Sequence, residues 1–242
     1  MALAKAVIES ELSSRFGGDV FKLAERRFTE ILATGIVEID SVIGGLPRGA
    51  ITEIFGPASS GRTSLMLSAL AHATTHEEAC AVVDTNNSFD PKSASKAGID
   101  LEQLLWLRCD GKLEHSFKAA DLILQAGGFG LVILDLGELP GAQARKIISS
   151  WWYRFRRVVE DKPTALVILA EDACVRSCAS LCLAMNKSEE DWSLIASSES
   201  PSRASKSPFT TRLLQGIKLH AERQRPIFLG AREILFKAHA AY

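Results

Sequence analysis

A glycine-rich loop between an apolar run and a helical pattern constrains the fold of this chain more than any other feature. The apolar run ITEIF (51–55) leads into the loop GPASSGRT (56–63), and apolar residues then recur at helical spacing over 63–74. The loop spacing matches G-x-x-x-x-G-K-[ST], in which glycines let main-chain N–H groups turn toward phosphates and the following helix adds the positive end of its dipole. The feature predicts a strand, a phosphate-binding loop and a helix at one edge of a parallel sheet.

The same loop supplies the candidate ligands of a nucleotide. They are Gly56, Pro57, Ser59, Ser60, Gly61, Arg62, Thr63 and Ser64. Thr63 would offer its hydroxyl to Mg²⁺, and Asp135, in the apolar run LVILDL (131–136), stands where a second carboxylate ligand is expected. Arg62 replaces the lysine of the motif and keeps its charge, but as a wide planar fork rather than a compact ammonium. We therefore expect ATP and Mg²⁺ to bind weakly if they bind, and we favour a site without hydrolytic activity.

Strand-like and helix-like patterns alternate through the middle of the chain. The apolar, β-branched runs lie at 51–55, 81–84, 104–107, 131–136 and 165–170, and the helical stretches at 63–74, 91–97, 115–126 and 142–160. This alternation predicts an α/β fold with three αβα layers around a mainly parallel central sheet. Four parts are expected: a helical arm (1–33), the core (34–186), a Ser-rich loop (187–211), and C-terminal strands (212–242) that complete the core as an edge hairpin.

Three segments carry a resemblance to a known family. They are TGIVEIDSVIGGLPRGAITEIFGPASSGRTSLMLSALAHA, VVDTNNSFDPKSASKAGIDLEQLLWLRCD and LVILDL. Residues 34–185 resemble the RecA family of DNA recombinases, which implies a RecA-like P-loop core. Asn86 stands where that family has its catalytic Glu and cannot accept a proton from water, and Ser93 stands near its adenine-stacking Tyr. The long DNA-binding loops that the family carries after Asp135 and after Ala170 are shortened or absent.

With these departures from the family pattern, the chain resembles the ImuA-type accessory proteins of bacterial mutagenesis cassettes. That resemblance implies a non-catalytic role in the SOS response, DNA repair and translesion synthesis, with no catalytic residue expected. The implied partners are RecA, an ImuB-type Y-family polymerase homologue and an error-prone replicative-type polymerase. The alternative is a compact, DNA-stimulated RecA-like ATPase of recombinational repair, in which Glu171 or Asp172 acts as the base. A small-molecule kinase is disfavoured by the GGLPRG segment.

The basic stretch RKIISSWWYRFRR (145–157) is a candidate contact surface. Its apolar residues at helical spacing, Ile148, Trp152, Phe155 and Val159, predict a helix stripe that faces the core. Trp151, Arg154 and Arg157 form a candidate surface patch for DNA or a protein partner. The C-terminal part, 203–237, is also rich in basic residues and fits either a phosphate-backbone contact or a solvated tail.

The charge balance and the cysteines bound the class of protein. Lys and Arg number 28 against 29 Asp and Glu, so a net charge of −1 excludes attraction of polyanions by the chain as a whole. No apolar run approaches the roughly 20 residues of a membrane span, and the N-terminal residues do not read as a signal peptide. An odd number of cysteines in such a chain predicts reduced thiols in the cytoplasm. Cys174, Cys178 and Cys182 recur every four residues, which predicts buried thiols on one helix face rather than a metal site.

Overall fold

A twisted eight-stranded sheet forms the centre of the computed structural model, which describes residues 30–137, 139, 141–144, 146–194, 212–226 and 232–239. The strands are β3 (Ala50–Phe55), β4 (Cys80–Asp84), β5 (Leu104–Arg108), β6 (Leu131–Leu136), β7 (Ala165–Ala170), β8 (Ala179–Leu194), β9 (Arg212–Arg225) and β10 (Arg232–His239). Their order in the sheet is β10-β9-β8-β3-β7-β6-β4-β5. Strands β8 to β5 are parallel, whereas β9 and β10 add an antiparallel hairpin at one edge. The predicted α/β fold and the predicted edge hairpin are confirmed.

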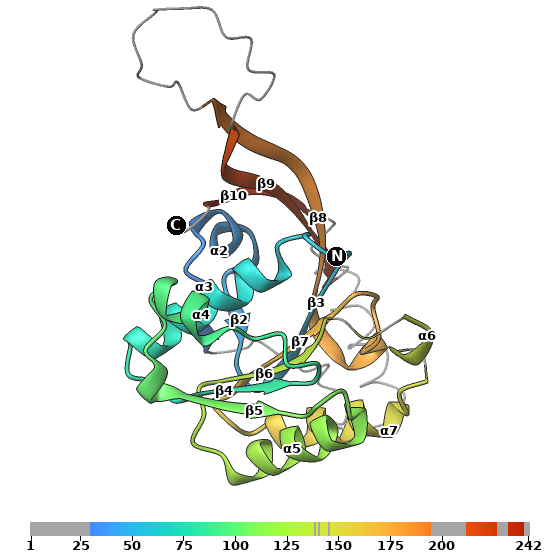
Figure 1. Cartoon of the computed structure of the whole chain (residues 1–242). Helices are drawn as coiled ribbons and strands as arrows, with labels where there is room; N and C mark the ends of the chain where they lie inside the picture. The colour runs from blue at the N-terminus through green and yellow to red at the C-terminus, as the bar shows by residue number, and fades with distance from the viewer. Residues whose placement is uncertain are drawn as a thin grey trace, which may run out of the picture.

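Helices cover both faces of the sheet (Figure 1). On one side lie α2 (Val37–Ile43), α3 (Arg62–Thr75) and α4 (Pro91–Lys96), and on the other lie α5 (Leu113–Ala126) and α7 (Ser149–Val159). The remaining short elements are α6 (Gly141–Ala144), the 3-10 turns η1 (Leu101–Gln103) and η2 (Arg176–Cys178), and a separate two-stranded sheet of β1 (Ile31–Leu32) with β2 (Leu46–Pro47). The arrangement is the predicted three-layer sandwich.

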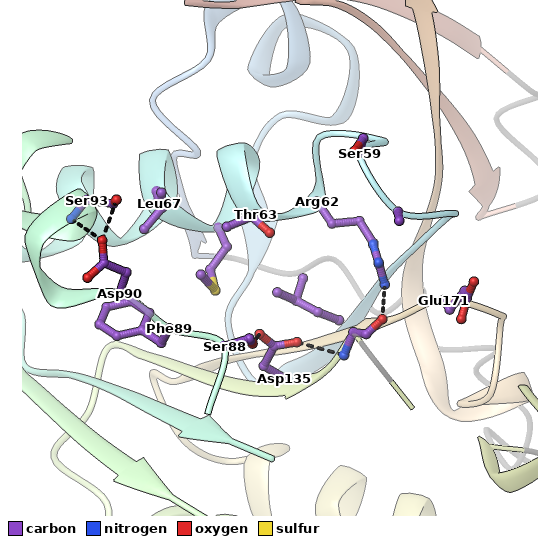
Figure 2. Close-up of a pocket in the computed structure, with 14 residues that line it drawn as sticks. Ser59, Arg62, Thr63, Leu67, Ser88, Phe89, Asp90, Ser93, Asp135 and Glu171 are labelled. Atoms are coloured by element: carbon purple, nitrogen blue, oxygen red, sulfur yellow. Dashed lines mark hydrogen bonds between the residues drawn. The ribbon is translucent and has the colours of Figure 1, made fainter. Parts of the chain in front are cut away.

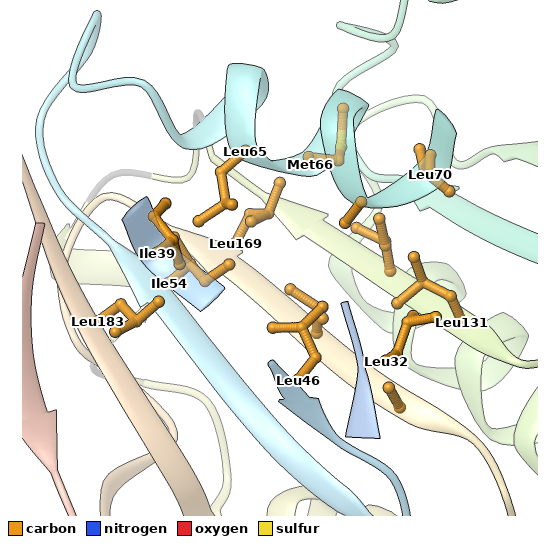
Figure 3. Packing of buried hydrophobic residues seen from close by; sticks show 14 of the residues in the cluster. Leu32, Ile39, Leu46, Ile54, Leu65, Met66, Leu70, Leu131, Leu169 and Leu183 are labelled. Atoms are coloured by element: carbon orange, nitrogen blue, oxygen red, sulfur yellow. The ribbon is translucent and has the colours of Figure 1, made fainter. Parts of the chain in front are cut away.

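The core consists of two apolar clusters, one on each face of the sheet. Figure 3 shows part of the first cluster, in which Leu65 of α3 lies near Ile54 and Leu169 of the sheet and Leu70 lies on the side of Leu131. The second cluster joins the other sheet face to α5 and α7. The central strands are buried on both faces because helices cover both, which explains their continuous apolar sequences. The same apolar sequences are the reason that these strands can be predicted from the sequence.

The predicted helix 142–160 is interrupted. Its residues form the short α6 and the longer α7, and Ile148 is the N-cap of α7 rather than a residue inside a helix. Ile148 is therefore 67% exposed, and its predicted place in the core stripe is wrong. Trp152, Phe155 and Val159 lie in the core, as the helical spacing predicts.

The helix predicted to carry three cysteines does not exist. Cys174 lies in a loop, Cys178 ends the turn η2, and Cys182 lies in strand β8. All three thiols are buried, and all five cysteines of the chain are free. A four-residue spacing suits a helix, but here a turn followed by a strand brings the three side chains to the interior.

Two predicted boundaries also differ. Strand β8 continues to Leu194 and so enters the predicted Ser-rich loop at 187–211, because the long antiparallel strand β9 pairs with it up to Leu194. Residues 195–211 of that loop lie outside the described residues. In the predicted N-terminal arm, 1–33, residues 1–29 lie outside the described part, and Ile31–Leu32 form a strand instead of a helix. Among the described residues, no helix is both long and apolar enough to cross a bilayer.

Candidate functional site

The glycine-rich loop lies where β3 ends and α3 begins. Gly61 has φ +92 and serves as the N-cap of α3, and a Cβ there would lie 2.3 Å from a methyl carbon of Leu219 in β9. A Cβ at Gly56 would lie 2.1 Å from the carbonyl oxygen of Met185 in β8. Both positions therefore require glycine, because the C-terminal strands pass close to the loop. Ser60 is buried, and its hydroxyl has no hydrogen-bond partner among the described residues.

A pocket of about 550 Å³ lies beside this loop, at the carboxyl ends of the parallel strands (Figure 2). It is lined by Ala58, Ser59, Arg62, Thr63, Met66, Leu67, Ser88, Phe89, Asp90, Ser93, Asp135, Gly137, Leu169 and Glu171. Four predicted site residues, Ser59, Arg62, Thr63 and Asp135, thus come together in one cavity. Gly56, Pro57, Ser60, Gly61 and Ser64 form the loop and the start of α3 but do not line the cavity.

The side chain of Arg62 reaches across the pocket to the segment after β6. Its Nη1 donates a hydrogen bond of 3.1 Å to the carbonyl oxygen of Gly137. The N–H of Gly137 donates to Oδ1 of Asp135 at 2.8 Å. The Gly137 residue is thus held by both predicted site residues, one at its N–H and one at its C=O (Figure 2).

Asp135 has an unusual electrostatic environment. Burial raises the pKa of this carboxyl group above its ordinary value, and the nearby carboxylate of Asp84 raises it further. The Gly137 N–H, the charge of Arg62 and the hydroxyl of Ser88, which lies 3.4 Å from Oδ2, act in the opposite direction. The net effect is a pKa of Asp135 above its ordinary value.

The far end of the pocket is built around the start of α4. The carboxylate of Asp90 caps this helix, accepting hydrogen bonds from the N–H of Lys92 at 3.2 Å and of Ser93 at 3.0 Å. It also accepts from the Ser93 hydroxyl at 2.6 Å, which is the main cause of the lowered pKa of Asp90. Phe89 lies behind it, buried against the ring of Trp106 at 5.5 Å. Ser93 therefore takes part in a helix cap and offers no aromatic surface to a ligand.

Asn86, at the family's catalytic Glu position, and the two alternative bases, Glu171 and Asp172, differ in their relation to the pocket. Asn86, in the segment after β4, is not among the residues that line the pocket. Of the two acidic residues considered after β7, Glu171 lines the pocket and Asp172 does not. A carboxylate for the alternative ATPase function could therefore come only from Glu171 of this pair.

Two of the three residues predicted as a contact patch on α7 make contacts within the fold, and the Arg154 guanidinium lies 6.0 Å from the centroid of the Trp151 ring. Trp151 packs against the rings of Phe117 and Phe155, at 5.5 and 5.9 Å between centroids. Arg154 donates two hydrogen bonds to the carboxylate of Asp121 on α5, at 2.6 and 2.5 Å. Arg157 alone of the three predicted residues is exposed without such a contact.

Sequence reasoning missed the parts of the site that come from main-chain geometry. The Gly137 peptide and the Ser88 hydroxyl both contact Asp135, and neither belongs to the loop motif. Asp84 is the sequence feature that could have indicated the wall of the pocket before α4. Its carboxylate accepts hydrogen bonds from the N–H groups of Ser88 and Phe89 and so fixes that segment. An aspartate at the end of a strand commonly holds the following turn by accepting hydrogen bonds from its main-chain N–H groups.

The residues present fit a nucleotide in part. The loop at the N-terminus of α3 and the exposed Thr63 suit a phosphate and its Mg²⁺. Two of the candidate ligands differ from the simple motif, because Arg62 is hydrogen-bonded to Gly137 and burial raises the pKa of Asp135.

Comparison with known proteins places the chain in a family. The model of the RecA N-terminal domain matches residues 2–139. RecA of Azospirillum lipoferum is 37% identical over 132 residues, and RecA of Rhodospirillum centenum is 38% identical over 131 residues; each match covers 52% of this chain and 36% of the relative. RecA of Rickettsia massiliae is 37% identical over 139 residues, which cover 55% of this chain and 40% of that protein. The matched region is thus well under half the length of these relatives. Because the family model covers more than half of the chain and includes the loop, β3 to β6 and Asp135, the chain belongs to the RecA N-terminal domain family.

Proposed function

We propose that this RecA-family chain is an accessory factor of the ImuA type. It acts in the cytoplasm of a bacterium, in the SOS response, DNA repair and translesion synthesis. It works through protein contacts, with RecA, an ImuB-type Y-family polymerase homologue and an error-prone replicative-type polymerase as partners. Its nucleotide site is degenerate, and it has no catalytic residue.

The position of Arg62 carries this proposal. A lysine at this place in the motif would reach the phosphates as a flexible point charge, whereas the guanidinium here is bound to the Gly137 carbonyl oxygen at 3.1 Å. Turning Arg62 toward a phosphate would break that hydrogen bond, which costs roughly 1 kcal/mol for a partly exposed pair. The cost weakens nucleotide binding, and a bidentate guanidinium that does reach a phosphate holds it in a different geometry from an ammonium.

Other features of the pocket support the same conclusion. Asn86 carries no carboxylate and does not line the pocket, and Ser93 is engaged in the cap of α4. A bound nucleotide would bring the phosphate charge that Mg²⁺ neutralises, and Thr63 with Asp135 would hold that ion. The pocket therefore supports weak binding better than turnover.

One observation favours the second candidate function, a compact DNA-stimulated ATPase. Glu171 lines the same pocket as Thr63 and Asp135, so a carboxylate is present beside the candidate metal ligands. In this case Glu171 acts as the base, and Arg62 must leave Gly137 to hold the nucleotide.

Turnover of ATP with Mg²⁺, measured with and without single-stranded DNA, separates the two functions. The native chain, the double variant Arg62→Lys/Asn86→Glu and Glu171→Gln are compared, with Arg157→Lys as the control for an Arg-to-Lys change on an exposed surface. The accessory function predicts no turnover above background in the native chain and in Arg157→Lys. Partial rescue in the double variant would show that these two positions explain the loss. DNA-stimulated turnover in the native chain that disappears in Glu171→Gln would establish the ATPase instead.

A further inference from the structure

Three arginines from distant parts of the sequence lie around the turn η2 and its buried Cys178. Arg176 belongs to η2, Arg225 ends β9, and Arg156 lies in the second half of α7. The Nη1 group of Arg225 donates to the carbonyl oxygen of Arg176, and Nη1 of Arg176 donates to the Ser149 hydroxyl at 3.3 Å. Arg156 and Arg225 both lie close enough to Cys178 to counter the effect of burial on the pKa of its thiol. We refer to Arg156, Arg176 and Arg225 as the arginine cluster.

The cluster lacks acidic partners in the part of the chain that the structure describes. No ion pair found among the described residues includes any of the three guanidinium groups. The neighbouring Arg154 makes a useful contrast, because Asp121 satisfies it with two hydrogen bonds. Arginine forks placed together without carboxylates repel one another, so the arrangement is unfavourable unless an external anion neutralises it.

The turn that presents Arg176 is held rigidly from inside the core. Glu53 of β3, which is 1% exposed, accepts hydrogen bonds from the N–H groups of Cys174 and Val175 at 2.5 and 2.8 Å. Arg176 follows directly with φ +58, a conformation that is uncommon for a residue with a long side chain. The contact of Arg225 with the Arg176 carbonyl oxygen fixes the other side of this residue. A strained residue fixed from both sides is a feature of binding sites, where the surrounding structure maintains the geometry.

The surroundings indicate the kind of anion. The chain carries a net charge of −1, so it has no general attraction for a polyanion whose binding draws on many phosphate contacts. Three guanidinium groups match a few carboxylates, each of which accepts two parallel hydrogen bonds from an arginine fork. Ile148, directly before Ser149, is 67% exposed and offers an apolar contact at the margin of the cluster. The three positive charges and the exposed Ile148 therefore favour a short acidic protein segment with an apolar side chain.

We propose that the arginine cluster is a docking site for an acidic segment of a protein partner. Carboxylates of the segment pair with Arg156, Arg176 and Arg225, and an apolar side chain rests on Ile148. The inference deepens the proposed accessory function and rests on it only in taking the partner to be a protein. It differs from the patch expected on α7, since Trp151 and Arg154 are engaged within the fold.

Binding of short fluorescent probes to the whole chain tests the proposal. The probes are a peptide of glutamates and leucines, the same peptide with glutamines in place of the glutamates, and oligo(dT). The acidic peptide should bind and the glutamine peptide should not. The native Arg156 side chain makes no hydrogen bond found among the described residues. Arg156→Glu should lower the affinity about tenfold through like-charge repulsion. Arg157→Glu, with the same charge change on the same helix, should leave the affinity within about twofold.

A second variant guards against loss of the fold. Arg176→Gln removes one guanidinium without adding a negative charge and should also weaken binding, while the melting temperature of each variant reports whether it is folded. Equal affinity of the parent and both cluster variants, or equal loss in Arg157→Glu, would overturn the proposal. So would oligo(dT) that binds at this cluster while the acidic peptide does not. ATP turnover plays no part in these measurements, so the docking site and the degenerate nucleotide site can fail independently.

Discussion

Removal of the buried carboxylate of Glu53 should destabilise the chain strongly. Glu53→Ala leaves the N–H groups of Cys174 and Val175 without their acceptor, and both are deep in the protein because Glu53 is 1% exposed. At roughly 2 kcal/mol for each unsatisfied buried donor, the loss in free energy of unfolding is about 4 kcal/mol. For a chain of this length that corresponds to a decrease of about 8–16 °C in melting temperature.

Glu53→Gln separates the hydrogen bonds from the charge. The amide oxygen of glutamine remains an acceptor for the same two N–H groups, so the expected loss is only about 1 kcal/mol. Glu102→Ala, at an exposed position in η1, is the control and should change stability by less than about 0.5 kcal/mol. Urea and thermal unfolding measure all three variants. A melting temperature of Glu53→Ala equal to that of the control, or equal losses in Glu53→Ala and Glu53→Gln, would refute the reasoning.

Three further predictions follow from packing and ionisation. Gly61→Ala should cost about 2–4 kcal/mol, from the positive φ and from overlap with Leu219, and addition of Leu219→Ala should relieve the overlap in a double-mutant cycle. Because the pKa of Asp135 is raised in the folded state, the contribution of this group to the free energy of unfolding should fall as pH rises above 3.8, and the difference in stability between the parent and Asp135→Asn should change accordingly in urea titrations at several pH values. Burial raises the pKa of Cys80 and of Cys182 to about 12, so iodoacetamide at mildly alkaline pH should leave both unmodified in the folded chain and label them in urea; labelling of the folded chain would contradict their burial.

The sequence was most informative where local pattern and tertiary environment agree. Runs such as LVILDL and ALVILA are apolar throughout because helices cover both faces of the sheet, so their composition alone identified buried parallel strands. The glycine-rich loop was recognisable for a similar reason, since its backbone conformation at Gly61 excludes other residues. The presence of Ser59, Arg62, Thr63 and Asp135 in one pocket follows from the rule that parallel strands present their carboxyl ends at one edge.

What could not be predicted depends on contacts between distant segments. The spacing of Cys174, Cys178 and Cys182 suits a helix, but pairing of β8 with β3 imposes a strand on the last of them. Arg62 could have pointed toward the pocket centre or toward a neighbour, and only the position of Gly137 after β6 decides this. The hydrogen bond from Arg154 to Asp121 depends on the position of α5 beside α7, which the sequence near Arg154 does not indicate. Each outcome is set by tertiary structure, which the local sequence does not encode.

The sheet order has a consequence for any attempt to isolate the part of this chain that matches its family. Both neighbours of β3 in the sheet, β7 and β8, begin after residue 139, where the family match ends. A fragment of 2–139 would therefore leave the strand that carries the glycine-rich loop with open hydrogen-bonding edges on both sides, and the loop without Met185 and Leu219 above it. The boundary of the homology is not a boundary of folding. Such a fragment should aggregate when expressed, whereas sequence similarity alone would suggest a convenient minimal domain.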